Sequence, residues 1–177
     1  MAINKEELIS ENTVLYVDQV RKSYGKKRVL KNMSFSIEKG KIVGFLGPNG
    51  CGKTTLVKLI NGLMPVTDGV ILVGGKKIGK ETKAMVSYLP ERTYLNNWMK
   101  VKDILDFFED LFEDFDRQRA EQMFSDMKIG LNEKLKNLSK GTKEKVQLVL
   151  VMSRQADLYI LDEPIAGVDP AARSYIM

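Results

Sequence analysis

The stretch GPNGCGKT at Gly47–Thr54 decides how the rest of the chain is interpreted. It fits the pattern G-x-x-x-x-G-K-[ST], in which glycines let the backbone curl around a phosphate group. The apolar run Lys41–Leu46 before it predicts a buried strand, and Thr55–Leu63 after it predicts a helix. A strand, a glycine-rich turn and a helix N-terminus in this order are typical of a site that binds the phosphates of a nucleotide.

Each residue type in this loop has a chemical reason. Lys53 places a positive charge near the β- and γ-phosphates, and the Thr54 hydroxyl is a ligand for Mg²⁺. Backbone N–H groups of the loop face one anion, and the following helix adds the positive end of its dipole. We therefore expect a nucleoside triphosphate to contact Gly47, Asn49, Gly50, Cys51, Gly52, Lys53, Thr54 and Thr55.

The segment LYILDE at Leu158–Glu163 suggests the second half of the site, because it is an apolar strand that ends in two carboxylates. Side chains alternate along a strand, so Asp162 and Glu163 need different roles. Asp162 suits Mg²⁺, bound directly or through water, and Glu163 suits a general base or water-polarising group. An acidic turn before Pro164 is the plain structural alternative. The guanine-reading pattern N-K-x-D does not occur, which lowers the case for a GTPase.

Composition excludes several other chemistries. The 177 residues contain no histidine and one cysteine, Cys51, so histidine triads, zinc clusters and intrachain disulfides are excluded. This cysteine usage makes a reducing, cytosolic setting the default. A net charge of +5 favours anionic partners or describes a solvated lysine surface. No apolar run approaches the roughly 20 residues needed to span a bilayer, so any role at a membrane requires a partner.

The periodicity of the chain predicts one strand-rich part with a helical insert, an α/β organisation. Val101–Phe115 has apolar residues at helical spacing and acidic residues on its other face, which favours a helix directed toward the core. Further helices are expected at Asp116–Met127 and Gly141–Gln155. Strands are expected at Thr13–Val20, Met33–Ile37, Val70–Ile78 (a hairpin turning at Gly74-Gly75), Ala84–Leu89 and Leu158–Leu161.

Together with the phosphate loop and LYILDEP, three further features resemble the nucleotide-binding domain of ATP-binding cassette proteins. LSKGT at Leu138–Thr142 resembles the family segment LSGGQ, and Ser139 lies 23 residues before Asp162, close to the family spacing. AGVD at Ala166–Asp169 resembles the family D-loop. Tyr24 resembles the aromatic residue that stacks on adenine. Glu91, in YLPE, occupies the place of the usual glutamine, where its oxygen can still coordinate Mg²⁺.

The resemblance implies a P-loop NTPase with a mainly parallel core sheet, an antiparallel β subdomain and a helical subdomain. Residues 1–91 and 156–177 would form the nucleotide-binding core with the β subdomain, and residues 92–155 the helical subdomain that carries LSKGT. Two such domains would pair head to tail around two Mg-ATP, with Ser139 and Gly141 meeting the γ-phosphate held by the other subunit's Lys53. The second domain would be an identical or a different ATP-binding subunit.

The resemblance also implies an ATPase that drives transport by a transmembrane subunit, with no nucleic acid partner. The chain would then be cytoplasmic and peripheral on the inner face of the cell membrane. Glu91 and the short helical insert resemble exporter-type subunits. The alternatives are a soluble cassette ATPase acting in translation or DNA repair, and a nucleotide-binding fragment that lacks hydrolysis.

Some features depart from the family pattern or stay open. Lys140 and Thr142 replace the family's glycine and glutamine, and Lys140 either adds charge near the phosphate or points to solvent. Tyr94 and Trp98 are either partner contacts or buried packing residues. The chain stops 14 residues after Glu163, before the region where family members carry a histidine at the γ-phosphate, so slow hydrolysis and self-association are expected of a truncated cassette.

Overall fold

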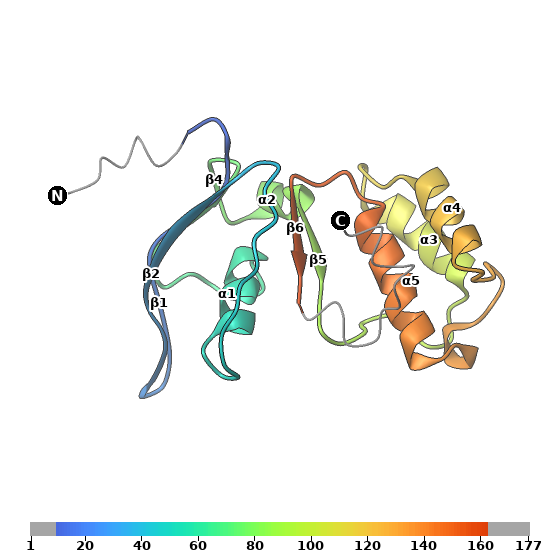
Figure 1. Cartoon of the computed structure of the whole chain (residues 1–177), viewed down its shortest axis with the longest axis horizontal. Helices are drawn as coiled ribbons and strands as arrows, with labels where there is room; N and C mark the ends of the chain where they lie inside the picture. Colours follow the sequence, from blue (N-terminus) through green and yellow to red (C-terminus); the bar gives the residue numbers. More distant parts are fainter. Residues whose placement is uncertain (1–9, 163–177) are drawn as a thin grey trace. The chain divides into compact units, whose positions relative to one another are not determined.

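The computed structural model describes residues 10–162, which fall into two compact units divided between Val86 and Ser87 (Figure 1). The first unit contains β1 (Thr13–Tyr24), β2 (Lys27–Glu38), α1 (Lys53–Ile60), β3 (Asp68–Val73), β4 (Lys76–Lys77) and α2 (Lys80–Met85). The division falls inside β5 (Val86–Leu89). The second unit continues with α3 (Val101–Leu111), α4 (Arg117–Asp126), the 3-10 turn η1 (Leu135–Asn137), α5 (Lys140–Met152) and β6 (Leu158–Leu161).

The first unit is built on an antiparallel sheet with the strand order β2-β1-β3-β4. The long β1–β2 hairpin is drawn in blue in Figure 1, with α1 beside it. Helix α1 packs against β2 and β3 and buries Leu56, Leu59 and Ile60. Gly74 and Gly75 have φ of +54° and +76°, which a tight two-residue turn requires, so the predicted hairpin turn is confirmed.

The predicted buried strand at Lys41–Leu46 is wrong in this structure. The segment forms no strand within residues 10–162, and the side chains of Ile42 and Leu46 are 85% and 92% exposed. Phe45 alone finds an aromatic neighbour, stacking on Phe35 of β2 with 6.4 Å between ring centroids. A strand exists only where a neighbouring strand accepts its backbone hydrogen bonds, and an apolar run does not specify that neighbour.

The strand predicted at Ala84–Leu89 is also corrected at its start, because Ala84 and Met85 complete α2. Helix α2 begins after Gly79, whose backbone N–H donates to the Thr82 hydroxyl at 2.9 Å. That local turn of helix takes the residues before Val86 out of the strand.

In the second unit, α3, α4 and α5 enclose one apolar core, to which α3 contributes Val101, Ile104, Leu105 and Phe108. The predicted helical face is therefore confirmed, but α3 ends at Leu111 and not at Phe115. Phe112 adopts an extended backbone. The rings of Phe112 and Phe115 pack on Phe108 at centroid distances of 5.5 and 5.7 Å.

The remaining helices begin at side-chain caps. The Asp116 carboxylate accepts the backbone N–H of Arg119 at 2.9 Å, which starts α4 one residue after the predicted start. The Ser139 hydroxyl accepts the backbone N–H of Thr142 at 3.1 Å, which starts α5 at Lys140.

Strands β5 and β6 form a separate two-stranded sheet. The backbone N–H of Asp162 donates to the carbonyl of Leu89 at 2.9 Å, so the C-terminal ends of both strands lie together, as in a parallel pair. Leu89 packs against Leu148 and Val151 of α5, and the Ser87 hydroxyl donates to the Val151 carbonyl at 2.9 Å. The sheet end that carries Asp162 is thereby fixed to α5.

Candidate functional site

The phosphate loop of the first unit is built from a backbone that only glycine adopts easily. Gly50 and Gly52 have φ of +79° and +106°, and Gly52 is the N-cap residue of α1. A Cβ on Gly52 would lie 2.7 Å from Leu30 Cδ2 and 3.2 Å from the Val29 carbonyl oxygen. The loop therefore lies directly on β2, and a larger residue at position 52 would push it away.

Lys53 closes this loop. Its Nζ donates to the carbonyl oxygens of Gly47 and Pro48 at 2.7 and 3.2 Å. These acceptors are neutral, so an anion in the loop would be a stronger partner for the ammonium group. The side chain is therefore held at the loop, and no acid among residues 10–162 pairs with its charge.

The residues present fit the phosphates of a nucleotide. Helix α1 has no acidic residue in its first turn and no side chain capping it, so its first N–H groups face the loop without a competing carboxylate. Thr54 is exposed at that end and offers a hydroxyl oxygen for Mg²⁺, and Thr55 is half-buried beside it. Cys51 is exposed, and a Cβ on Gly47 would lie 2.8 Å from its Sγ.

Tyr24 lies at the end of β1, paired with Lys27 beside the hairpin tip. It is 48% exposed, and its hydroxyl donates to Met64 Sδ at 3.2 Å. The same hairpin brings Val29 and Leu30 against Gly52. An exposed ring on this hairpin fits the predicted base-stacking role, which stays a prediction.

Two candidate magnesium ligands lie at one end of the second unit's small sheet. Asp162 directly follows β6, and Glu91 follows β5 by two residues. Both carboxylates, together with burial as the largest cause, raise the pKa of Tyr88. Tyr88 is a residue that the sequence interpretation missed. Side chains alternate along a strand, so Tyr88 points to the opposite face of the sheet from its neighbours Ser87 and Leu89.

Among the described residues, no three or more His, Cys, Asp or Glu side chains form a cluster that could hold a metal ion. Thr54 belongs to the first unit, and Asp162 and Glu91 belong to the second. Glu163 and the Ala166–Asp169 segment lie outside the described residues. The joint role of Thr54, Asp162 and Glu91 as magnesium ligands stays a prediction.

The LSKGT segment forms the N-terminus of α5. Ser139 is its N-cap, and its hydroxyl also lies 2.8 Å from that of Thr142. The side chain of Lys140 is 91% exposed and its Nζ lies 3.8 Å from Glu144 Oε1, which leaves both alternatives for this residue open. The Lys143 ammonium group donates to Asn97 Oδ1 at 3.0 Å. Ser139 and Gly141 thus stand at a helix end without an acidic residue in its first turn.

Comparison with known proteins identifies the family. The family profile described as ABC transporter matches residues 30–166. The chain belongs to the ABC transporter family. The solved structure of an ATP binding subunit of an ABC transporter superposes with a TM-score of 0.84 at 30% identity, covering 93% of this chain and 72% of that one. A Pyrococcus furiosus ABC transporter ATP-binding protein gives a TM-score of 0.77 at 30% identity, covering 92% and 81%.

These neighbours confirm the predicted α/β P-loop NTPase fold, to which ABC ATP-binding domains belong. Among curated relatives, the linearmycin resistance ATP-binding protein LnrL of Bacillus subtilis is 34% identical over 174 residues, which is 93% of this chain and 55% of the relative. The manganese transport system ATP-binding protein MntB of the same species is 34% identical, over 91% and 68%. The chain spans about half the length of several curated relatives that it matches, such as LnrL and YtrB. No helix within residues 10–162 is long and apolar enough to cross a membrane.

Proposed function

We propose that this chain binds Mg-ATP at the phosphate loop and hydrolyses it, as an ATP-binding subunit that drives a membrane transporter. The observation that carries the proposal is the loop itself. Gly52 lies directly on β2, the first turn of α1 has no acidic residue, and Lys53 donates to two carbonyl oxygens. Membership of the ABC transporter family supports ATP as the nucleotide.

The protein groups divide the chemistry between them. Lys53 would exchange its carbonyl partners for the β- and γ-phosphate oxygens, and the loop N–H groups would hold the remaining phosphate charge. Thr54, Asp162 and Glu91 would hold Mg²⁺, which supplies a positive charge that spreads the negative charge of the phosphates. Glu163 would orient a water and accept its proton as it attacks the γ-phosphate. Tyr24 would stack on the base.

The arrangement of two subunits is the finer part of the proposal. Ser139 and Gly141, at the N-terminus of α5, would complete the nucleotide site of a second ATP-binding subunit, identical or different. The same two residues of that second subunit would complete the nucleotide site of this chain. Bound ATP then joins the two subunits and hydrolysis separates them. The division into a core of residues 1–91 and 156–177 and a helical subdomain of residues 92–155 belongs to the same proposal.

A transmembrane subunit is the proposed partner outside this pair, and it would hold the chain at the inner face of the cell membrane. Tyr94 and Trp98 are 51% and 69% exposed in the segment between Glu91 and α3, which supports partner contact over buried packing. Relatives are named for linearmycin resistance, manganese transport and phosphonates import. We propose an exporter-type subunit on the strength of Glu91 and the short helical segment.

Steady-state phosphate release from Mg-ATP tests the proposal on the purified chain. We expect release by the wild type and its loss in Lys53→Ala and in Glu163→Gln, with Glu163→Gln still binding ATP. Lys58→Ala removes an exposed lysine from the other end of α1 and is the matched control, which should keep the wild-type rate. Equal release by the wild type and Glu163→Gln would contradict the proposed hydrolysis while leaving ATP binding intact.

A further inference from the structure

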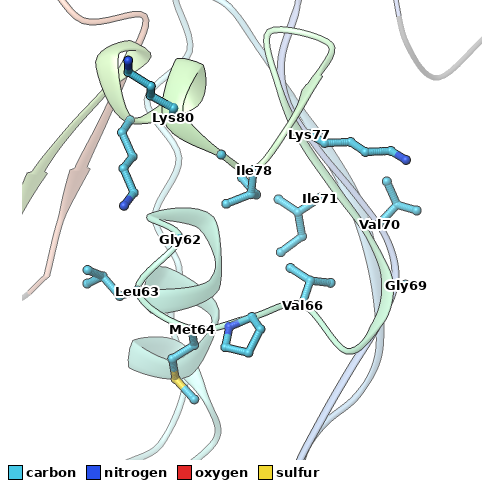
Figure 2. A pocket seen from close by; sticks show the side chains of 13 residues that line it. Gly62, Leu63, Met64, Val66, Gly69, Val70, Ile71, Lys77, Ile78 and Lys80 are labelled. Carbon is cyan, nitrogen blue, oxygen red and sulfur yellow. The ribbon is translucent and has the colours of Figure 1, made fainter.

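The first unit contains a cavity of about 750 Å³ at the end of α1 opposite the phosphate loop (Figure 2). Its walls come from the segment that follows α1, from the start of β3 and from the connection between β4 and α2. None of the lining residues belongs to the proposed nucleotide site. The volume lies in the range of about 300–1,000 Å³ that is typical of small-molecule sites.

Apolar side chains form one part of the cavity wall. Figure 2 shows the side chains of Val66, Ile71 and Ile78 directed toward one another across it. On one side, a Cβ on Gly62 would lie 3.0 Å from Ile78 Cγ2 and 3.6 Å from Lys83 Cε, so the stem of Lys83 runs along this wall. A lysine stem that covers apolar surface keeps its ammonium group at the edge.

The walls are held in place from behind by β1. Gly69 has φ of +85°, and a Cβ there would lie 2.5 Å from the carbonyl oxygen of Asp18. The buried Lys22 donates through Nζ to the carbonyl of Pro65 at 3.0 Å. Both contacts fix the segment between α1 and β3, so the cavity is preformed and does not depend on a ligand to open it.

The rim carries one sign of charge. Lys77, Lys80 and Lys83 line the cavity and no acidic residue does. None of the three ammonium groups has a hydrogen-bond or ion-pair partner among residues 10–162, whereas that of the neighbouring Lys76, outside the lining, pairs with Glu81 at 2.6 Å. Unpaired ammonium groups around an apolar opening attract a ligand that is negatively charged at one end.

We propose that this cavity binds an anionic amphiphile, with its apolar chain among Val66, Ile71 and Ile78 and its carboxylate or phosphate group at Lys80 and Lys83. The same chemistry is offered by a free alkyl carboxylate and by an anionic membrane lipid. The site is independent of nucleotide binding, because Lys80 and Lys83 take no part in the phosphate loop.

Calorimetry with dodecanoate, dodecyl phosphate, dodecylammonium and acetate, all below micelle-forming concentrations, tests both parts of the ligand. We expect saturable one-to-one binding of the first two and none of the last two. Reversing two charges in Lys80→Glu/Lys83→Glu should weaken dodecanoate binding at least about tenfold. The matched control Lys102→Glu/Lys136→Glu makes the same change of net charge at exposed lysines of the second unit and should bind as the wild type does.

A neutral variant tests the apolar part. Val66→Phe places a larger ring where the alkyl chain is proposed to lie, without changing charge, and should weaken dodecanoate binding while Mg-ATP affinity and the melting temperature stay within error. Equal binding of dodecylammonium, or full dodecanoate binding by either Lys80→Glu/Lys83→Glu or Val66→Phe, would overturn the proposal. Co-sedimentation with phosphatidylglycerol vesicles that is lost in Lys80→Glu/Lys83→Glu would identify a membrane lipid as the source. Binding of monomeric dodecanoate without such co-sedimentation would identify a free amphiphile.

Discussion

At the scale of single residues, the phosphate loop depends on two glycines that look alike in the sequence and differ in their surroundings. Gly50 and Gly52 both have a left-handed backbone. A Cβ on Gly50 would meet nothing within 4 Å, whereas one on Gly52 would meet Leu30 and Val29 of β2. Glycine is required at position 50 for the left-handed backbone alone. At position 52 it is also required for the close approach of the loop to the sheet.

This difference predicts the result of two alanine substitutions. Gly50→Ala should lower the free energy of unfolding by about 1–2 kcal/mol, the cost of a left-handed alanine. Gly52→Ala adds a collision with packed atoms and should cost about 1–3 kcal/mol more. Urea unfolding of both variants measures the difference, and equal stabilities would show that β2 yields to the added methyl group.

Cys51 allows a chemical test of the same loop. The thiol is exposed and lies beside Gly47, so a maleimide adduct would occupy the space in which the phosphates are proposed to bind. We expect modified protein, confirmed by mass spectrometry, to lose Mg-ATP binding. Cys51→Ala should bind Mg-ATP before and after the same treatment. Normal binding by the modified wild type would place the phosphates elsewhere.

At the scale of helices and strands, one buried ion pair joins the end of α3 to the segment between α5 and β6. Arg154 is 3% exposed, and its Nε and Nη2 donate to the two oxygens of Asp114 at 2.9 and 3.0 Å. Its guanidinium also lies 3.9 Å from the centroid of the Phe112 ring. Tyr159 of β6 donates its hydroxyl to the Arg154 carbonyl, so the strand that ends at Asp162 is anchored to the same cluster.

Removing one partner of this pair should be costly, because it takes away a carboxylate that accepts two hydrogen bonds from a buried guanidinium. We expect Asp114→Ala to lower the free energy of unfolding by about 3 kcal/mol. Asp110→Ala removes an exposed carboxylate four residues earlier, at the end of α3, and should change the stability by less than about 0.5 kcal/mol. Urea unfolding followed by circular dichroism compares the two. A similar small effect of both substitutions would contradict the anchoring role.

At the scale of the whole molecule, the sequence predicts most accurately those helices, strands and loops that are determined by residues close together in the chain. The strand Leu158–Leu161 is found at its predicted residues, and α4 starts within one residue of its prediction because Asp116 caps it. The phosphate loop is equally local, since a strict spacing of glycines and lysine specifies it. The predictions that are wrong concern segments whose structure depends on residues distant in the sequence. The run Lys41–Leu46 has no strand partner within residues 10–162. Helix α3 ends at Leu111, just before Phe112 and Asp114 contact the distant Arg154, and a helical pattern does not encode those contacts.

Pairing of two subunits by ATP is a prediction for the whole molecule. Ser139→Asp keeps a good helix cap for α5 but places a carboxylate where the partner's γ-phosphate is proposed to bind. We expect sedimentation velocity to show dimers of the wild type with Mg-ATP and only monomers of Ser139→Asp. The conservative variant Ser139→Thr should dimerise. Nucleotide-dependent dimers of Ser139→Asp would remove Ser139 from the subunit interface.

Titration of Mg-ATP into the wild-type chain and into Lys53→Ala, followed by calorimetry, tests the central claim most directly. Loss of the Lys53 ammonium should weaken binding by about 2–3 kcal/mol, roughly 30- to 150-fold in Kd, because a charge-assisted contact to the phosphates is removed. Lys58→Ala, at the other end of α1, should bind as the wild type does. Equal Mg-ATP affinities of the wild type and Lys53→Ala would contradict the account of the phosphate loop.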